Sequence, residues 1–153
     1  NELDIQTITN FIDQSERLNA EIKTVDSIKK AKTIMFYEEM DIILVDINIQ
    51  GMKFEELFEV FDKDNLLIPY IVITDEREED LGIEAVKKGA QDYLVRSELS
   101  ERILRRGIIY SLERHDILQS LYRTTIIDEL TGLYNRRGLY TLGNQQVELA
   151  KRH

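Results

Sequence analysis

The chain has 153 residues, of which 42% are hydrophobic and 32% are charged, a composition typical of a soluble globular protein. It contains no cysteine and only two histidines, which excludes disulfides, thiolate metal sites, cysteine nucleophiles and histidine-based metal sites. No apolar stretch approaches the ~20 residues of a membrane span, and no signal-peptide pattern opens the chain. We therefore expect a cytoplasmic protein that does not insert into a membrane.

The net charge of −9 is unevenly distributed along the chain. Residues 1–98 contain 11 basic and 23 acidic side chains, for a net charge of −12. Residues 99–153 contain 9 basic and 6 acidic side chains, for a net charge of +3. The acidic first part argues against binding to nucleic acid, and the change of sign predicts a boundary between two modules near residue 98.

The first forty residues predict two helices with a short strand between them. Apolar residues recur at helical spacing over residues 3–16, as they do on the buried face of an amphipathic helix. Residues 20–25, AEIKTV, alternate between apolar and polar side chains and predict a short strand. Asp26 or Ser27 can cap a second helix that runs to about Tyr37.

The strand predicted next carries the first candidate functional residue. Residues 42–45 form a short apolar run rich in β-branched side chains, which suits a strand buried on both faces of a parallel sheet. The run ends at Asp46, and a carboxylate at the carboxyl end of such a strand lies where open α/β sheets place their chemistry. The alternative interpretation is that Asp46 only ends the strand and caps the following turn.

The segments after Asp46 continue an alternation of helices and strands. They are a helix over residues 54–61, a strand over 69–74, a helix that follows the acidic segment 75–80 and stops before Gly89, and a strand over 92–95. This alternation predicts the α/β class, with a doubly wound parallel sheet covered by helices on both faces.

A long helix is predicted from about Glu98, with Gly107 as its interior break. Apolar residues at roughly heptad spacing can share a seam along it; they are Leu104, Ile108, Leu118 and Tyr122. One interpretation is a single helix docked on its own sheet. A coiled coil is favoured for the later half, because a helix this long extends beyond the domain it would cover.

Four residues lie at the end of a predicted strand or in the loop after it, namely Asp46, Thr74, Tyr93 and Arg96. With them, residues 1 to about 125 resemble the receiver domain of two-component response regulators, a flavodoxin-like fold whose core would be residues 1–98. The resemblance implies that Asp46 accepts a phosphoryl group, that Thr74 and Arg96 bind it, and that Tyr93 is the switch aromatic. It also implies Mg²⁺ as the cofactor, bound by Asp46 and by the backbone carbonyl of Asn48.

The sequence departs from the family pattern in the loop after the phosphoacceptor and at the N-terminus. Gln50, Lys53 and Phe54 stand where the family usually has proline, an acidic residue and glycine. Arg96 replaces a lysine, which exchanges a compact ammonium for a wider planar fork. The family's first strand and the acidic pair that holds Mg²⁺ are missing before Asn1.

Two expectations follow from the missing strand. Asp46 should be unmodified, with any Mg²⁺ weakly held or absent, because most of the oxygen ligands are lacking. An empty central position in the sheet would leave backbone groups unpaired at ~1–3 kcal/mol each, so we expect residues upstream of Asn1 to supply the strand. The alternatives are that another segment fills the position, for example one exchanged from a partner chain, or that the remaining strands close up. Direct pairing of residues 20–25 with residues 41–46 would contradict this expectation.

A second resemblance begins at Asp128. Residues 128–139, DELTGLYNRRGL, resemble the opening of a GGDEF domain, the catalytic module of diguanylate cyclases. The alternative is a helix stop at Gly132 followed by a basic turn. The chain ends at His153, before any nucleotide site or catalytic carboxylates, so residues 128–153 would be an N-terminal fragment without enzyme activity of its own.

The two resemblances together imply a function. A sensor histidine kinase would phosphorylate Asp46, and the helix after Glu98 would pair with that of a second copy and control a C-terminal diguanylate cyclase, with residues 99–127 as a coiled-coil linker. The first alternative is a pseudo-receiver, a dimerisation or protein-binding module without phosphorylation. The second is a flavodoxin-like cofactor binder, which the absence of a phosphate-cradling loop disfavours.

Overall fold

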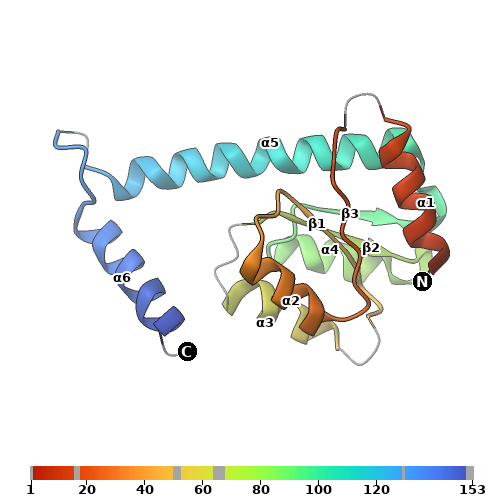
Figure 1. Ribbon diagram of the computed structural model, residues 1–153, viewed down its shortest axis with the longest axis horizontal. Coiled ribbons are helices and arrows are strands. Elements are labelled where there is room, and N and C mark those ends of the chain that lie inside the picture. The colour runs from red at the N-terminus through yellow and green to blue at the C-terminus, as the bar shows by residue number, and fades with distance from the viewer. Residues whose placement is uncertain (1, 16–17, 50–52, 64–67, 129, 151–153) are drawn as a thin grey trace. The chain divides into compact units, whose positions relative to one another are not determined.

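The computed structural model describes residues 2–15, 18–49, 53–63, 68–128 and 130–150 (Figure 1). It divides the chain into two compact units, residues 1–112 and residues 113–153. The helices are α1 (Glu2–Asp13), α2 (Ile28–Tyr37), α3 (Phe54–Lys63), α4 (Glu79–Lys87), α5 (Glu101–Ile126) and α6 (Arg136–Ala150). The strands are β1 (Ile43–Asp46), β2 (Tyr70–Thr74) and β3 (Asp92–Val95), with short 3-10 turns η1 (Glu76–Glu78) and η2 (Arg96–Glu98).

The first unit is built on a parallel sheet in the order β1-β2-β3. In its register Asp46 lies beside Ile73, and Thr74 lies beside Val95. Every residue of the central strand β2 is buried, as its continuous apolar run predicts. The predicted α/β parallel sheet and its three apolar strands are therefore confirmed.

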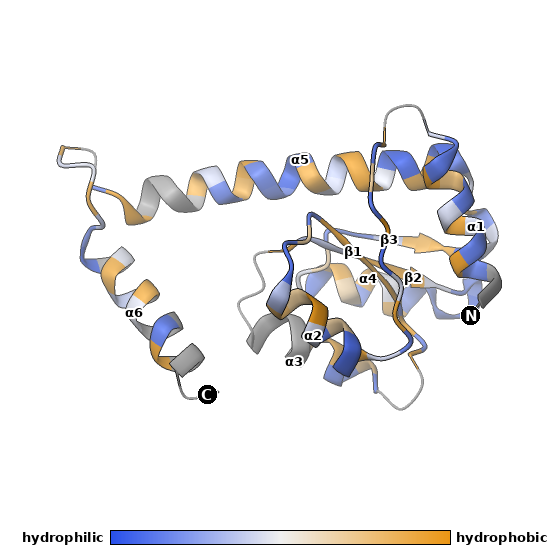
Figure 2. Ribbon diagram, in the orientation of Figure 1, coloured by the Kyte–Doolittle hydropathy of each residue, from blue (hydrophilic) through white to orange (hydrophobic). Residues whose placement is uncertain are grey.

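Helices cover both faces of this sheet, and each face has its own cluster of buried apolar residues. One cluster joins Val45 and Val72 of the sheet to Leu57 and Phe58 of α3 and to Ala85 of α4. The other cluster joins α1 and α5 to the opposite face, and its fully or nearly buried members are Ile12, Ile71, Leu94, Leu104 and Ile108. The colouring in Figure 2 shows apolar residues along the strands.

The prediction of a strand over residues 20–25 is wrong. The structure has no strand there, and Ile22 alone of the segment packs against the second apolar cluster. Alternation of side chains is not sufficient for a strand, because a strand also needs a hydrogen-bonded neighbour.

The edge of β1 that faces away from β2 has no paired strand among the described residues. The N–H groups of Ile43 and Ile47 donate to Pro69 and Ile73 on the β2 side, so in a parallel ladder the N–H of Leu44 points to the open edge. Residues 20–25 do not pair there. The expectation that upstream residues supply a strand thus stays a prediction.

The first turns of α5 belong to the first unit. Leu104 is fully buried and Ile108 is 5% exposed, both against their own sheet, so the prediction that they lie at a seam between two helices is wrong. Heptad spacing marks a buried face but does not identify what buries it. Leu118, in contrast, is 51% exposed, and the side chain of Tyr122 lies outside the described part of the chain.

The second unit contains the later part of α5, a tight turn and α6. Asp128 Oδ1 accepts hydrogen bonds from the backbone N–H and the hydroxyl of Thr131, at 2.9 and 2.8 Å, and Gly132 follows with a positive φ of 67°. Asn135 Oδ1 accepts from the N–H of Gly138 at 3.0 Å and so caps the first turn of α6. None of the described helices is long and apolar enough to cross a membrane.

Candidate functional site

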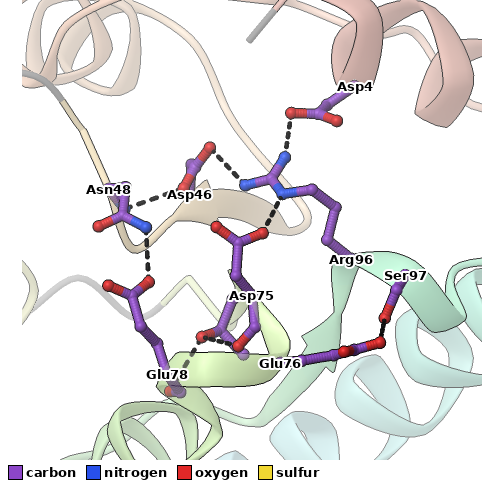
Figure 3. A network of polar contacts seen from close by, with 9 residues as sticks. Asp4, Asp46, Asn48, Asp75, Glu76, Glu78, Arg96 and Ser97 are labelled. Carbon is purple, nitrogen blue, oxygen red and sulfur yellow. Dashed lines mark hydrogen bonds and ion pairs between the residues drawn. The ribbon is translucent and has the colours of Figure 1, made fainter.

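Three of the four site residues predicted from the sequence lie at the same edge of the sheet, where the strands end, and the fourth, Tyr93, lies within β3. Asp46 is the last residue of β1, Thr74 is the last residue of β2, and Arg96 follows the last residue of β3. Because the three strands are parallel and adjacent, their carboxyl ends meet at this edge. Figure 3 shows Asp46 and Arg96 pointing toward each other.

The Arg96 guanidinium is the centre of the polar network (Figure 3). Its Nη2 donates to Asp46 Oδ2 at 2.9 Å, its Nε donates to Asp75 Oδ1 at 2.8 Å, and its Nη1 forms an ion pair with Asp4 of α1. Partial burial opposes the charge, but the hydrogen bonds to Asp46, Asp75 and Asp4 outweigh it and raise the pKa of Arg96 above its usual range. Arg96 therefore remains a cation at any pH at which the protein folds.

Both carboxylate oxygens of Asp46 have partners. Oδ2 accepts from Arg96, and Oδ1 accepts from the backbone N–H of Asn48 at 2.9 Å. The second contact is the turn-capping role that the alternative interpretation assigned to Asp46. Asp46 therefore both caps the turn, through Oδ1, and pairs with Arg96, through Oδ2, because the two oxygens of one carboxylate can bind different partners.

Thr74 is fully buried, and its hydroxyl faces the following turn rather than Asp46. The Oγ1 donates to the backbone carbonyl of Glu78 at 3.0 Å, with a longer contact of 3.3 Å to the carbonyl of Asp75. A bond from Thr74 to a phosphoryl group on Asp46 would therefore require its hydroxyl to leave these carbonyls.

Tyr93 lies on β3 with its ring against α4. Its hydroxyl donates to Glu79 Oε1 at 2.9 Å, and a Cβ built on Gly82 would lie 2.6 Å from the ring. The hydrogen bond to Glu79, with smaller contributions from desolvation and nearby acids, raises the pKa of Tyr93. The sequence predicted that Tyr93 belongs to the site. In the structure its ring contacts Glu79 and Gly82 of α4.

The residues in and after the loop that follows Asp46 are partly described. Phe54 packs edge to face on Phe58 with ring centroids 4.7 Å apart, and Lys88 lies over both rings. This packing accounts for an aromatic residue at position 54. Gln50 lies outside the described residues.

Two site residues could not be singled out from the sequence. Asp4 lies 92 positions before Arg96, and only the docking of α1 brings them together. Asp75 directly follows Thr74, but in an acidic run that we interpreted only as a favourable helix N-terminus. Neither residue belongs to a motif that would have marked it.

The residues described around Asp46 do not by themselves make a Mg²⁺ site. Among them there is no group of three or more carboxylate or histidine side chains that could hold a metal ion. The Asp46 carboxylate is bonded to Arg96 and Asn48, and the carbonyl of Asn48 adds one neutral ligand at most. Of the near-octahedral set of oxygen ligands that Mg²⁺ takes, these two residues could supply only a part, and water would have to supply the rest.

Comparison with known proteins identifies the first unit. Residues 1–106 match the response regulator receiver domain family. A receiver domain from Clostridium thermocellum is similar, with 19% identity, a TM-score of 0.66, and coverage of 77% of this chain and 92% of that one. The receiver domain of a Francisella response regulator has 19% identity, a TM-score of 0.59, and coverage of 74% and 91%.

The comparison with curated proteins gives no match. No comparison supports the GGDEF resemblance of residues 128–139. The family match covers more than half of the chain and agrees with the fold of both solved structures and with the strand-end positions of Asp46, Thr74 and Arg96. The chain therefore belongs to the response regulator receiver domain family of two-component signalling proteins.

Proposed function

We propose that this chain accepts a phosphoryl group on Asp46 from a sensor histidine kinase. The observation that carries the proposal is the meeting of Asp46, Thr74 and Arg96 at the carboxyl ends of adjacent parallel strands, with Asp46 and Arg96 joined at 2.9 Å. A nucleophilic carboxylate beside a permanent cation is what phosphoryl transfer to an aspartate needs from a protein.

In the proposed reaction an oxygen of Asp46 attacks the phosphorus of a phosphohistidine. The new O–P bond forms as the P–N bond breaks, and the imidazole nitrogen keeps the electron pair. Arg96 already donates a hydrogen bond to Asp46 and can form an ion pair with the phosphoryl oxygens. Thr74 can donate to those oxygens once its hydroxyl leaves the carbonyl of Glu78.

Receiver domains typically bind Mg²⁺, which offsets phosphoryl charge when it is bound. The described residues supply Asp46 and the Asn48 carbonyl toward such a site and no group of three acidic or histidine ligands. No step of the proposed reaction is therefore assigned to the metal.

Labelling with a small phosphodonor tests the proposal. The chain is incubated with radiolabelled acetyl phosphate, with and without Mg²⁺, and acyl phosphate is measured. We expect label in the unchanged chain and in Asp75→Asn, and none in Asp46→Asn. Asp75→Asn is the matched control, because it removes another carboxylate that pairs with Arg96. Equal labelling of the unchanged chain and Asp46→Asn would refute the assignment.

The alternative function is that of a pseudo-receiver, which binds a protein partner without phosphorylation. Two features favour it: both oxygens of Asp46 already have partners, and the described residues lack a metal-binding group. The same labelling experiment decides between the two, because a pseudo-receiver stays unlabelled at any Mg²⁺ concentration.

For the output we propose pairing of α5 between two copies and, in a longer protein, control of a diguanylate cyclase that begins near Asp128. The pairing is supported by large apolar side chains that are more than half exposed on the later part of α5, namely Ile117, Leu118 and Leu121. Their exposure differs from the full burial of Leu104 near the start of the helix.

Light scattering at micromolar concentration tests the pairing. We expect a dimer for the unchanged chain and a monomer for Leu118→Glu, because a charge on the seam is desolvated on pairing. Ser120→Glu is the matched control, since Ser120 is exposed and lies away from Leu118 around the helix. A monomeric unchanged chain, or a dimer lost equally in both variants, would refute the pairing.

A further inference from the structure

Residues 75–79, DEREE, contain four carboxylates, and each accepts a hydrogen bond from a different residue of the site or its flank. The pairs are Asp75 with Arg96 at 2.8 Å, Glu76 with Ser97 at 2.5 Å, Glu78 with Asn48 at 2.6 Å and Glu79 with Tyr93 at 2.9 Å. Their donors come from the loop after β1, from β3 and from η2. One acidic turn therefore contacts Tyr93 of β3 and the segments that follow β1 and β3; Figure 3 shows the contacts of Asp75, Glu76 and Glu78.

The backbone of the same turn also binds Thr74. The buried hydroxyl of Thr74 donates to the carbonyl of Glu78, whose side chain in turn accepts from Asn48 Nδ2. Glu78 thus contacts both the strand-end hydroxyl and the loop that follows the phosphoacceptor. Most of these bonds are exposed to solvent and individually weak, so their effect depends on their convergence on one short segment.

A phosphoryl group on Asp46 would compete with this turn. It carries close to two negative charges and three strong acceptor oxygens. Arg96, which bonds to Asp46, also bonds to Asp75, and the hydroxyl of Thr74 at the end of the adjacent strand bonds to the carbonyl of Glu78. The new charge would also repel these carboxylates, because like charges at short range disfavour each other.

We propose that residues 75–79 form an anionic clamp in which Glu78 is a positioning residue, holding Asn48 and Thr74 in the unphosphorylated arrangement until a phosphoryl group on Asp46 displaces it. Displacement of the clamp by a phosphoryl group rests on the proposed function. The positioning of Asn48 and Thr74 by Glu78 does not, and it can be tested in the unphosphorylated protein.

The kinetic test compares Glu78→Gln with Glu39→Gln. The first variant keeps an acceptor oxygen for Asn48 and removes the charge that opposes the phosphoryl group. The second makes the same charge change in the segment before β1, at the opposite edge of the sheet. We expect Glu78→Gln to raise the rate of labelling by acetyl phosphate at least about fivefold, the lower end of typical couplings between sites. Glu39→Gln should change it less than about twofold, because exposed charges are screened beyond a Debye length.

The second readout needs no phosphorylation. In NMR spectra of the unphosphorylated chain, we expect Glu78→Ala to shift the side-chain amide signals of Asn48, because the carboxylate that accepts from it is lost. The variant keeps the backbone carbonyl that accepts from Thr74, but the turn that carries this carbonyl loses its side-chain bond to Asn48, so the methyl signal of Thr74 should shift as well. Glu39→Gln should shift neither. Unchanged Asn48 and Thr74 signals in Glu78→Ala would overturn the positioning role.

The two tests separate this inference from the proposed function. A chain that is not labelled at all refutes phosphorylation and, with it, displacement of the clamp, while the NMR result still decides whether Glu78 positions Asn48 and Thr74. A labelled chain whose rate is unchanged or lowered in Glu78→Gln refutes displacement and leaves the function in place.

Discussion

Replacing Gly82 with alanine tests whether α4 must lack a side chain where it meets Tyr93. An ideal Cβ at position 82 would lie 2.6 Å from Cδ2 and 2.8 Å from Cγ of the Tyr93 ring. Carbon atoms in contact normally lie ~3.5–4.0 Å apart, so either the ring or the helix has to move by about 1 Å. The ring is also tied to α4 by the hydrogen bond from its hydroxyl to Glu79, which resists that movement.

The expected size of the effect comes from two opposing contributions. Alanine in a helix interior is favoured over glycine by about 1 kcal/mol, whereas overpacking of this kind costs about 1–3 kcal/mol. We therefore expect Gly82→Ala to lower the free energy of unfolding by up to about 2 kcal/mol. We also expect the NMR signals of the Tyr93 ring to shift.

Gly107→Ala is the matched control in the same unit. Its Cβ would lie 3.4 Å from a methyl group of Leu94, which is an ordinary contact, so most of the gain of about 1 kcal/mol should remain. Urea unfolding of the two variants should differ by about 2 kcal/mol. If Gly82→Ala were as stable as Gly107→Ala, with unchanged Tyr93 signals, the close approach of α4 to Tyr93 would not be real.

Three further predictions concern packing and charge. Leu104→Ala should lower the free energy of unfolding by about 2–5 kcal/mol in urea titrations, because Leu104 is fully buried. Leu118 is exposed, so Leu118→Ala should change the free energy of unfolding of the monomer by less than about 0.5 kcal/mol. Glu79→Gln should lower the pKa of Tyr93, measured by NMR titration of its ring carbons, because the charged acceptor of its hydroxyl is lost; an unchanged pKa would contradict this pair. Hydrogen bonds from Thr131 lower the pKa of Asp128, so they should stabilise the turn fully at any pH above the ordinary carboxyl pKa. This stabilisation should be lost as the pH falls through the lowered pKa of Asp128, and the backbone amide NMR signals of the turn would report the loss.

The sheet could be predicted because its strands are local and distinctive in sequence. Residues 70–74 and 43–46 are apolar runs that end in a polar residue, and the positions of those polar residues placed Asp46 and Thr74 at the same edge. The strand expected at residues 20–25 failed for a physical reason: its pattern is local, but a strand requires a neighbour, which that segment lacks in the structure.

The polar contacts of the site could not be predicted in the same way. Arg96 was identified from its position after β3, but its partners Asp4 and Asp75 depend on where α1 and η1 dock. The direction of the Thr74 hydroxyl is likewise set by the turn that follows it, through the carbonyl of Glu78. Spacing along the chain predicts which strand end a residue occupies, and only packing decides which way its side chain turns.

The ion pair between Arg96 and Asp4 connects the charge at the site to the packing of α5. Asp4 lies on α1, and Ile12 of the same helix belongs to the buried cluster that contains Leu104 and Ile108. Loss of this ion pair would remove a restraint on the first turn of α1. A displacement of α1 would then alter the apolar cluster that it shares with α5. The N-terminal helix is thus joined to the site at one end by charge and to the start of α5 by apolar packing.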